Sequence, residues 1–197
     1  MHEPIIAVLD ANILWSTPAR SFLLELARYR MFHPLWSKKI YQEWTKSFYY
    51  QYRPKYRQEH IRHVGNLMNA AFPEAIVRNY GPLIKHLVLP DPKDRHVLAA
   101  GIVGKATHIV TFNLKDFPER SLRKYDMVAI HPDKFLQLLY QRDPLTMLRA
   151  FRRTVARMQL HRPDARHVLV DALRRSRLPF CRRLDQKELG EEHPSDR

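Results

Sequence analysis

Apolar runs and amphipathic stretches alternate along the first 140 residues of the chain. Residues 5–9 are all apolar and mostly branched, which is typical of a parallel strand buried on both faces. Thr17 as a cap and Pro18 in the first turn then mark the start of a helix over residues 19–30. The pattern therefore predicts a strand followed by a helix at the beginning of the chain.

The alternation continues through the middle of the chain. Ser37 is placed to cap a helix that ends near Pro54. The predicted helices cover residues 38–52, 55–72, 74–80 and 95–106, and the predicted strands cover residues 83–89, 107–112 and 127–131. Helices that alternate with strands in this way predict the α/β class, with a mostly parallel central sheet.

Residues beyond Tyr140 differ in composition from the rest of the chain. Between residues 142 and 183, twelve arginines stand against three aspartates in two helical patterns, and the residues after Leu184 are acidic and polar. A basic helical segment and a polar tail are therefore predicted to follow the α/β part. The predicted parts are an α/β domain over residues 1–142, a helical extension over 143–184 and a disordered tail over 185–197.

Positive charge dominates the composition. The 197 residues include 34 lysines and arginines against 20 aspartates and glutamates, which gives a formal net charge of +14. The isoelectric point calculated from the sequence is near 10.2. Such charge favours a polyanionic partner, nucleic acid before membrane, because neutralising phosphates releases counterions. An acidic protein partner is the alternative that charge alone leaves open.

Cysteine usage and the lack of long apolar stretches predict where the protein resides. Cys181 is the single cysteine, so an intrachain disulfide is excluded and a reducing cytoplasm is expected. The sequence shows neither a signal-peptide pattern at its start nor the roughly 20 apolar residues that a membrane helix needs. These observations predict a soluble cytoplasmic protein.

Polar and acidic residues follow the ends of two predicted strands. Asp10 comes directly after the first strand, and Asn113 and Asp116 follow the strand over residues 107–112. In an open α/β sheet, the edge formed by the carboxyl ends of the strands is where ligands bind. The alternatives are a turn or cap role for Asp10, and a turn that Asn113 caps and that has Asp116 as its third residue.

Further acids lie on predicted helices. Asp94 belongs to the i, i+3, i+4, i+7 face that turns toward the sheet, where Gly101 permits close packing, whereas Asp91 is better suited to cap the helix. Glu43 falls on the shoulder of the apolar stripe of its helix, from which it can reach the sheet edge. A solvated acid beside Lys39 is the alternative reading of Glu43.

The predicted topology brings four of these acids to one edge of the sheet if the connections are right-handed crossovers. They are Asp10, Glu43, Asp94 and Asp116. Four carboxylates at close range repel one another, and a divalent cation relieves that repulsion. Oxygen ligands select Mg²⁺ or Mn²⁺ over zinc, and such ions serve phosphoryl chemistry. Together with the positive net charge, the pattern indicates a nuclease.

The blocks that carry the acids resemble those of a known family. The four acidic blocks of the PIN-domain ribonucleases, especially the VapC-type toxins of type II toxin–antitoxin modules, resemble the stretches VLDANIL, IYQEW, DRHVLAAGIV and IVTFNLKDF. The resemblance covers about residues 4–135. It implies a PIN-like α/β/α sandwich, cleavage of RNA by water attack, a homodimer, and an antitoxin that keeps the toxin inactive.

The resemblance also assigns roles to individual residues. It implies that Mg²⁺ or Mn²⁺ is bound by the catalytic acids Asp10, Glu43, Asp94 and Asp116, with Asn12, Thr111 and Asn113 as polar support for the metal waters. The helical segment over residues 54–80 is longer than in the compact toxins. The arginine-rich residues 143–184 lie outside the shared core, as in the branch of VapC-like proteins with a C-terminal extension.

A second class of function remains as the alternative. A non-catalytic basic RNA- or DNA-binding protein, in which the acids are only helix caps, predicts no dependence of RNA cleavage on Mg²⁺. Residues 47–57 mix aromatic and basic side chains, for which packing within the protein is favoured over stacking on RNA bases. The histidines, His96 and His108 among them, are assigned no chemistry because none has a zinc-ligand setting with cysteine.

Overall fold

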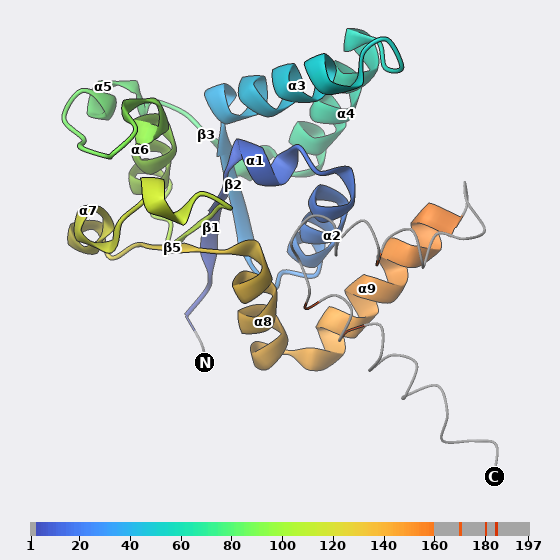
Figure 1. Cartoon of the computed structure of the whole chain (residues 1–197). Helices are drawn as coiled ribbons and strands as arrows, with labels where there is room; N and C mark the ends of the chain where they lie inside the picture. Colours follow the sequence, from blue (N-terminus) through green and yellow to red (C-terminus); the bar gives the residue numbers. More distant parts are fainter. Residues whose placement is uncertain (1–2, 160–169, 171–179, 181–183, 185–197) are drawn as a thin grey trace. The chain divides into compact units, whose positions relative to one another are not determined.

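The computed structural model describes residues 3–159 together with residues 170, 180 and 184 (Figure 1). The chain divides into two compact units. The first unit combines Met1–Trp15 with Phe32–His131, and the second combines Ser16–Met31 with Pro132–Arg197. The second predicted helical pattern beyond residue 160 and the tail over residues 185–197 lie outside the described residues.

A five-stranded sheet forms the centre of the first unit (Figure 1). The strands are β1 (Ile6–Leu9), β2 (His33–Ser37), β3 (Ile76–Val77), β4 (His108–Val110) and β5 (Val128–Ile130). Their order is β3-β2-β1-β4-β5, and each neighbouring pair is parallel. The central strand β1 contributes Ala7, Val8 and Leu9 to the core, each with no exposed surface. Because all strands run the same way, their carboxyl ends share one edge.

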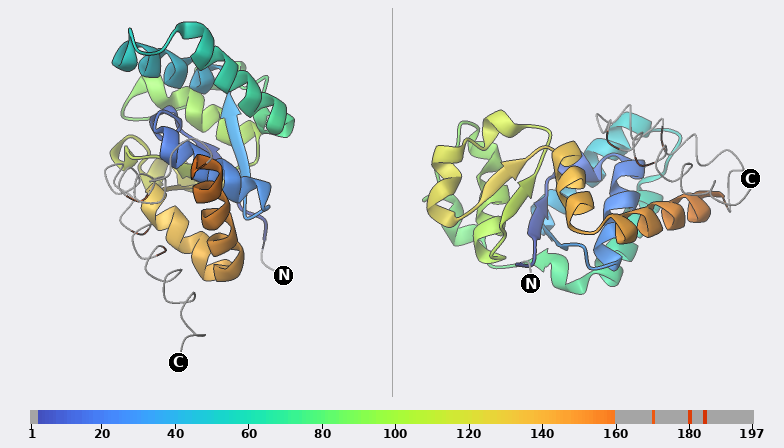
Figure 2. Two further views of the ribbon diagram at one scale, coloured as in Figure 1. Left: turned by 90° about the vertical axis from the view of Figure 1, so that its right-hand side faces the viewer. Right: turned by 90° about the horizontal axis from the view of Figure 1, so that it is seen from below.

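Helices of the first unit follow the strand ends. The α-helices are α1 (Ala11–Leu14), α3 (Lys38–Tyr52), α4 (Gln58–Ala71), α5 (Gly81–Ile84), α6 (Arg95–Val103) and α7 (Glu119–Leu122), and the 3₁₀ turns are Pro73–Ala75, Pro92–Asp94, Leu114–Asp116 and Arg123–Tyr125. Helices α3 and α4 lie side by side as an antiparallel pair (Figures 1 and 2). Helix α6 packs against β1, β2 and β4.

The second unit is helical in its described part. It contains α2 (Thr17–Arg28), α8 (Pro132–Arg142) and α9 (Pro144–Gln159). Helices α2 and α9 pack together, with the rings of Phe22 and Phe151 edge to face at 5.8 Å between centroids. Glu25 is buried in the same contact and accepts a hydrogen bond of 2.9 Å from Nη1 of Arg157. A buried carboxylate needs such a cationic partner to remain charged.

Several predicted elements are confirmed. The first strand, the strands at residues 107–112 and 127–131, and the helix at 38–52 all occur, and the parallel sheet with its helices confirms the α/β class. Ser37 caps α3 as predicted, since its Oγ accepts a hydrogen bond of 3.2 Å from the Ile40 amide. Helix α9 confirms helical structure after residue 143.

Two predicted elements are wrong, and one strand was missed. The strand expected over residues 83–89 is wrong, because Gly81 and Pro82 start the short helix α5 and the following residues join no sheet. The helix expected over residues 74–80 is also wrong, since two β-branched residues there form β3 beside β2. Strand β2 was not predicted because Pro34, which argues against a central strand, interrupts its apolar run.

Gly101 is buried on α6, where the sequence predicts close packing. A Cβ atom at this position would lie 2.8 Å from Cε of Met127 and 3.5 Å from Cγ2 of Val8. We expect Gly101→Val to lower the free energy of unfolding by about 1–3 kcal/mol and the melting temperature by roughly 2–10 °C. Thermal unfolding by circular dichroism measures this. Gly81→Ala is the control, because no atom lies within 4 Å of its added Cβ.

No helix in the described part of the chain combines the length and the hydropathy that crossing a membrane requires.

Candidate active site

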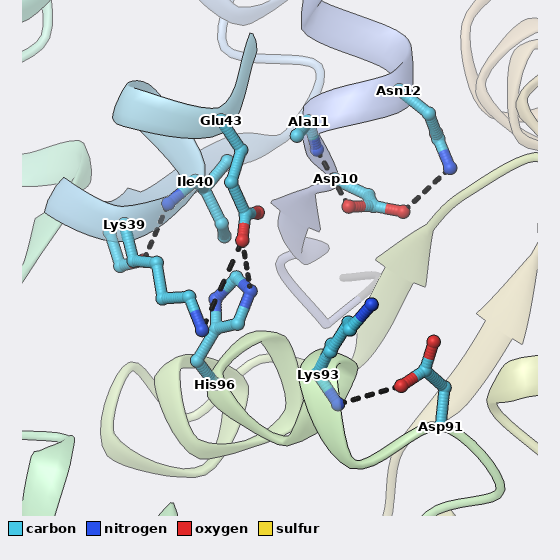
Figure 3. A network of polar contacts seen from close by, with 10 residues as sticks. Asp10, Ala11, Asn12, Lys39, Ile40, Glu43, Asp91, Lys93 and His96 are labelled. Carbon is cyan, nitrogen blue, oxygen red and sulfur yellow. Dashed lines mark hydrogen bonds and ion pairs between the residues drawn. The ribbon is translucent and has the colours of Figure 1, made fainter. Parts of the chain in front are cut away.

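Asp10 lies where β1 gives way to α1, and it is 8% exposed. Its two carboxylate oxygens accept three hydrogen bonds. Oδ1 accepts from the amide of Ala11 at 2.6 Å, and Oδ2 accepts from Nδ2 of Asn12 at 2.7 Å (Figure 3). Oδ2 also accepts from the Thr111 hydroxyl at 2.7 Å. The carboxylate is therefore held in one orientation at the carboxyl end of the central strand.

Burial works against the charge of Asp10. Burial is the largest cause that raises the pKa of Asp10, and the negative charge of Glu43 raises it further. The hydrogen bonds from Thr111 and Ala11 lower the pKa but do not offset these effects, so it remains above its usual value. Three donors thus compensate only part of the cost of burying this carboxylate.

Asn12 and Thr111 connect the ends of β1 and β4. Besides its bond to Asp10, Asn12 donates from Nδ2 to Oγ1 of Thr111 at 3.0 Å. The amide of Asn113 donates to the same hydroxyl oxygen, also at 3.0 Å. Asn12 and Thr111 therefore act on Asp10 directly through their side chains. Asn113 supports the cluster through its backbone, while its side chain is exposed.

Asp91 and Asp94 have different roles at the start of α6. Asp91 caps the 3₁₀ turn, since its Oδ1 accepts a hydrogen bond of 2.8 Å from the Lys93 amide (Figure 3). Asp94 stands at the N-cap position of α6 but makes no capping bond with its side chain. The cap predicted for Asp91 is confirmed, and the role of Asp94 in the site stays a prediction.

Burial and neighbouring acids both act on Asp94. Burial raises the pKa of Asp94 to about 6, with further contributions from the negative charges of Asp10, Asp91 and Asp116, while His96 lowers it. Carboxylates influence one another in this way only at short range. Asp10, Asp94 and Asp116 therefore share one electrostatic neighbourhood at the sheet edge.

Asp116 reaches this neighbourhood from the turn after β4. Asn113 stands at the N-cap position of the turn Leu114–Asp116 without a capping bond from its side chain, and the Asp116 amide donates to the Asn113 carbonyl at 3.1 Å. The side chain of Asp116 is half-buried. The alternative of a side-chain cap by Asn113 is therefore wrong.

Glu43 contacts a buried histidine that sequence reasoning missed. Oε1 of Glu43 lies 3.0 Å from Nε2 of His96, which is 1% exposed, and 4.0 Å from Nζ of Lys39 (Figure 3). The glutamate is on α3 and the histidine on α6, so the contact joins two helices. Glu43 keeps 38% of its side chain exposed. A polar residue within the buried face of α6, two positions after Asp94, is the signal in the sequence.

Within the described residues, no three aspartate, glutamate, histidine or cysteine side chains stand close enough together to hold a metal ion as placed. The chemistry of the acids nevertheless fits a hard divalent cation, because carboxylate oxygens are the donors that Mg²⁺ and Mn²⁺ prefer. The raised pKa values of Asp10 and Asp94 fit as well, since a cation offsets the same repulsion and burial.

Comparison with known proteins identifies the family of the chain. The model of the family described as PIN domain matches residues 7–115. A protein of Mycobacterium tuberculosis named "Putative ribonuclease VapC50" is 57% identical over 44 residues, which are 22% of this chain and 26% of that protein. The match thus spans about a quarter of the relative's length. No solved structure matches the chain significantly.

Proposed function

The chain belongs to the PIN-domain family, and from this premise we propose that it is a metal-dependent endoribonuclease of the VapC toxin type. One observation carries the proposal: the buried Asp10 carboxylate is held at the carboxyl end of the central strand by hydrogen bonds from Ala11, Asn12 and Thr111. Crowded carboxylates at the carboxyl edge of a parallel sheet suit a divalent cation and a phosphodiester. The relative's name, a ribonuclease, supports RNA as the substrate.

The residues proposed to hold Mg²⁺ or Mn²⁺ are the carboxylates of Asp10, Glu43, Asp94 and Asp116. When bound, such an ion polarises the phosphate and lowers the pKa of a water molecule. Asn12 and Thr111 keep the Asp10 carboxylate oriented through hydrogen bonds of 2.7 Å each. Asn113 completes the polar support, because its backbone N–H donates a hydrogen bond to the Thr111 hydroxyl oxygen.

Each acid is supplied by a different element. Asp10 follows β1, Glu43 is on α3, Asp94 precedes α6 and Asp116 ends the turn after β4. This arrangement binds and orients a phosphodiester without any one loop having to form the whole site. The half-exposed Glu43 leaves one side of the acidic cluster open to a polymeric substrate. A long RNA strand can therefore enter without passing through a closed cavity.

The partners follow from the same proposal. We propose an RNA substrate, a cognate antitoxin that neutralises the toxin, a homodimer and a cytoplasmic location. The net charge of +14 supports binding of a polyanion.

Incubation with total RNA tests the function. We expect cleavage by the native protein in Mn²⁺ or Mg²⁺, none in chelator, and none by Asp94→Asn under any condition. Gel electrophoresis of the RNA with end mapping measures the products. If the native protein binds RNA but never cuts it, and the acid variants bind equally well, the non-catalytic binding protein is the correct reading.

His96 gives a separate prediction about the site. Its Nε2 hydrogen is placed to donate to Glu43, and its buried Nδ1 has no hydrogen-bond partner within the described part of the chain. We expect His96→Ala to weaken Mn²⁺ binding by about 10–100-fold, because Glu43 loses the group that orients it. Isothermal titration with Mn²⁺ measures the affinity.

His96→Gln is the matched variant, because its amide retains a donor at a similar distance from the backbone. We expect it to recover a large part of the Mn²⁺ affinity. If both variants bind Mn²⁺ as the native protein does, His96 only fills space in the core.

A further inference from the structure

A pocket lies at the same edge of the sheet as the acids. It has a volume of about 670 Å³ and lies between the first turns of α3, the side of α4 and the residues that follow β3. Pockets of 300–1,000 Å³ are of the size that holds a small organic ligand. None of the acids assigned above lines it.

Helix α3 separates this pocket from the acidic cluster. Lys38, Tyr41 and Gln42 line the pocket, whereas Lys39 and Glu43 contact one another on the neighbouring face. Successive residues differ by about 100° around a helix, so the two sets occupy adjacent faces of the same two turns. A polymer bound at Glu43 therefore needs to pass over only one helix to reach the pocket.

The lining of the pocket suits a nucleobase. The aromatic residues that line it are Trp36, which is 1% exposed, and the half-buried Tyr41 and Tyr80. Unpaired RNA bases are recognised by stacking on such rings and by hydrogen bonds to their edges. Lys38 and Arg78 line the same pocket, and no carboxylate is among the described residues around it. An electropositive lining suits the phosphates on either side of a base.

Two asparagine side chains that line the pocket, Asn66 and Asn69, can form hydrogen bonds to the edge of a base. Oδ1 of Asn69 accepts a bond of 2.9 Å from Nε1 of Trp36. An indole N–H can only donate, so this bond fixes the amide orientation and leaves Nδ2 of Asn69 as a donor. Asn66 lies on the same face of α4 and is exposed. Amide donors match the carbonyl oxygens and ring nitrogens that bases present.

The backbone holds this lining in place. Asn79 adopts a left-handed conformation with φ of 59°, which asparagine tolerates better than most residues, and it precedes Tyr80 in the turn. Gly65 leaves room for the Tyr41 ring, because a Cβ there would overlap the ring atoms. The position of Tyr80 thus depends on the backbone conformation of Asn79, and the position of Tyr41 depends on the absence of a side chain at Gly65.

From these observations we propose that the pocket binds one unpaired nucleobase of the RNA strand, next to the phosphodiester that is cut. The proposal rests on the proposed ribonuclease function and adds the determinant of base preference. A segment of a protein partner is the competing occupant. Such a segment contains no nucleobase, so experiments with RNA distinguish it from the proposed ligand.

Two substrates test the pocket. One is a single-stranded RNA, and the other is bis(p-nitrophenyl) phosphate, a diester without a base. We expect Tyr80→Ala to raise KM for RNA about 10-fold with little change in kcat, since stacking on one aromatic ring contributes roughly 1–3 kcal/mol. Asn66→Ala should relax the base preference at one position of the cut site. Cleavage of the base-free diester should not change in either variant.

Leu67→Ala is the matched control, because Leu67 is exposed on α4 next to Asn66 but does not line the pocket. It should leave both substrates unaffected. If the native protein cuts RNA while Tyr80→Ala and Asn66→Ala keep its KM and base preference, the pocket does not bind RNA and the proposal is overturned. Loss of activity on both substrates overturns it too, since the variants then damage the catalytic site itself.

A binding measurement separates this proposal from the proposed function. If the native protein cuts neither substrate, the ribonuclease proposal fails. Fluorescence anisotropy with a labelled single-stranded RNA then decides the pocket alone. We expect Tyr80→Ala to weaken RNA binding about 10-fold relative to Leu67→Ala. Equal affinities for these two variants contradict a nucleobase site.

Discussion

Asp94→Asn is expected to abolish RNA cleavage and to stabilise the metal-free protein at neutral pH. Removing one charged ligand of a catalytic cation removes several kcal/mol of transition-state stabilisation, on the order of 10³-fold in kcat. Steady-state cleavage of an RNA substrate measures the loss. Asp91→Asn is the control, because the amide keeps the cap to the Lys93 backbone and lies outside the proposed ligand set. We expect it to keep activity within a few-fold of native.

The effect of Asp94→Asn on stability has a defined dependence on pH. The folded-state pKa of Asp94 is raised from 3.8 to about 6, so its ionisation destabilises the fold as the pH rises from about 4 to 6. Asp94→Asn removes this penalty. Because Asp94 is only half-buried, solvent screening limits the gain to about 1 kcal/mol, or ~2–4 °C in melting temperature at pH 7.5.

Melting curves in chelator at pH 4 and pH 7.5 check this sign. The difference between Asp94→Asn and the native protein should be small at pH 4, because this pH lies only just above the unfolded-state pKa of 3.8, where the penalty begins to develop. A variant that melts well below the native protein at pH 7.5 would show that Asp94 is needed for the fold rather than for catalysis.

Removal of divalent metal is expected to abolish cleavage, and its return is expected to stabilise the protein. Binding to the folded state alone adds about 2.7 kcal/mol when the metal is at 100 times its dissociation constant, or roughly 5–10 °C in melting temperature. Protons compete for Asp94, whose pKa is about 6, so the shift caused by Mn²⁺ should be larger at pH 8 than at pH 5.5. Differential scanning fluorimetry measures both shifts.

Two controls accompany the metal experiment. Potassium chloride at equal ionic strength should give no comparable shift, and Asp94→Asn should lose most of the shift caused by Mn²⁺. If the variant and the native protein are stabilised equally by Mn²⁺, the ion binds somewhere other than the acidic cluster.

Local signals in the sequence predicted the elements around the site. Ser37 as a cap followed by an apolar stripe was enough to predict α3, because capping and helix periodicity depend on neighbours in sequence. Asp10, Asp94 and Asp116 were expected together because parallel strands end at one edge, and the charges of Asp10 and Asp116 both raise the pKa of Asp94. Their role as metal ligands stays a prediction.

Long-range contacts explain what the sequence did not reveal. Strand β3 has only two residues and is defined by its pairing with β2, so its two β-branched residues are too short a pattern to reveal it in the sequence. The bond between Glu43 and His96 joins residues on two helices that are far apart in sequence. Single-residue patterns contain no information about such a pairing, and His96 therefore looked like an ordinary core position.

The route of the chain affects how the protein can be dissected. The chain leaves the first unit after Trp15 and returns to it at Phe32. The segment between these points contains α2, so part of the connection between β1 and β2 belongs to the second unit. Deleting everything after His131 would remove Phe151, which packs against Phe22 of α2, and Arg157, which donates a hydrogen bond to Glu25. Helix α9 therefore cannot be removed without loss of contacts to α2, and its contribution is better studied by point substitution than by truncation.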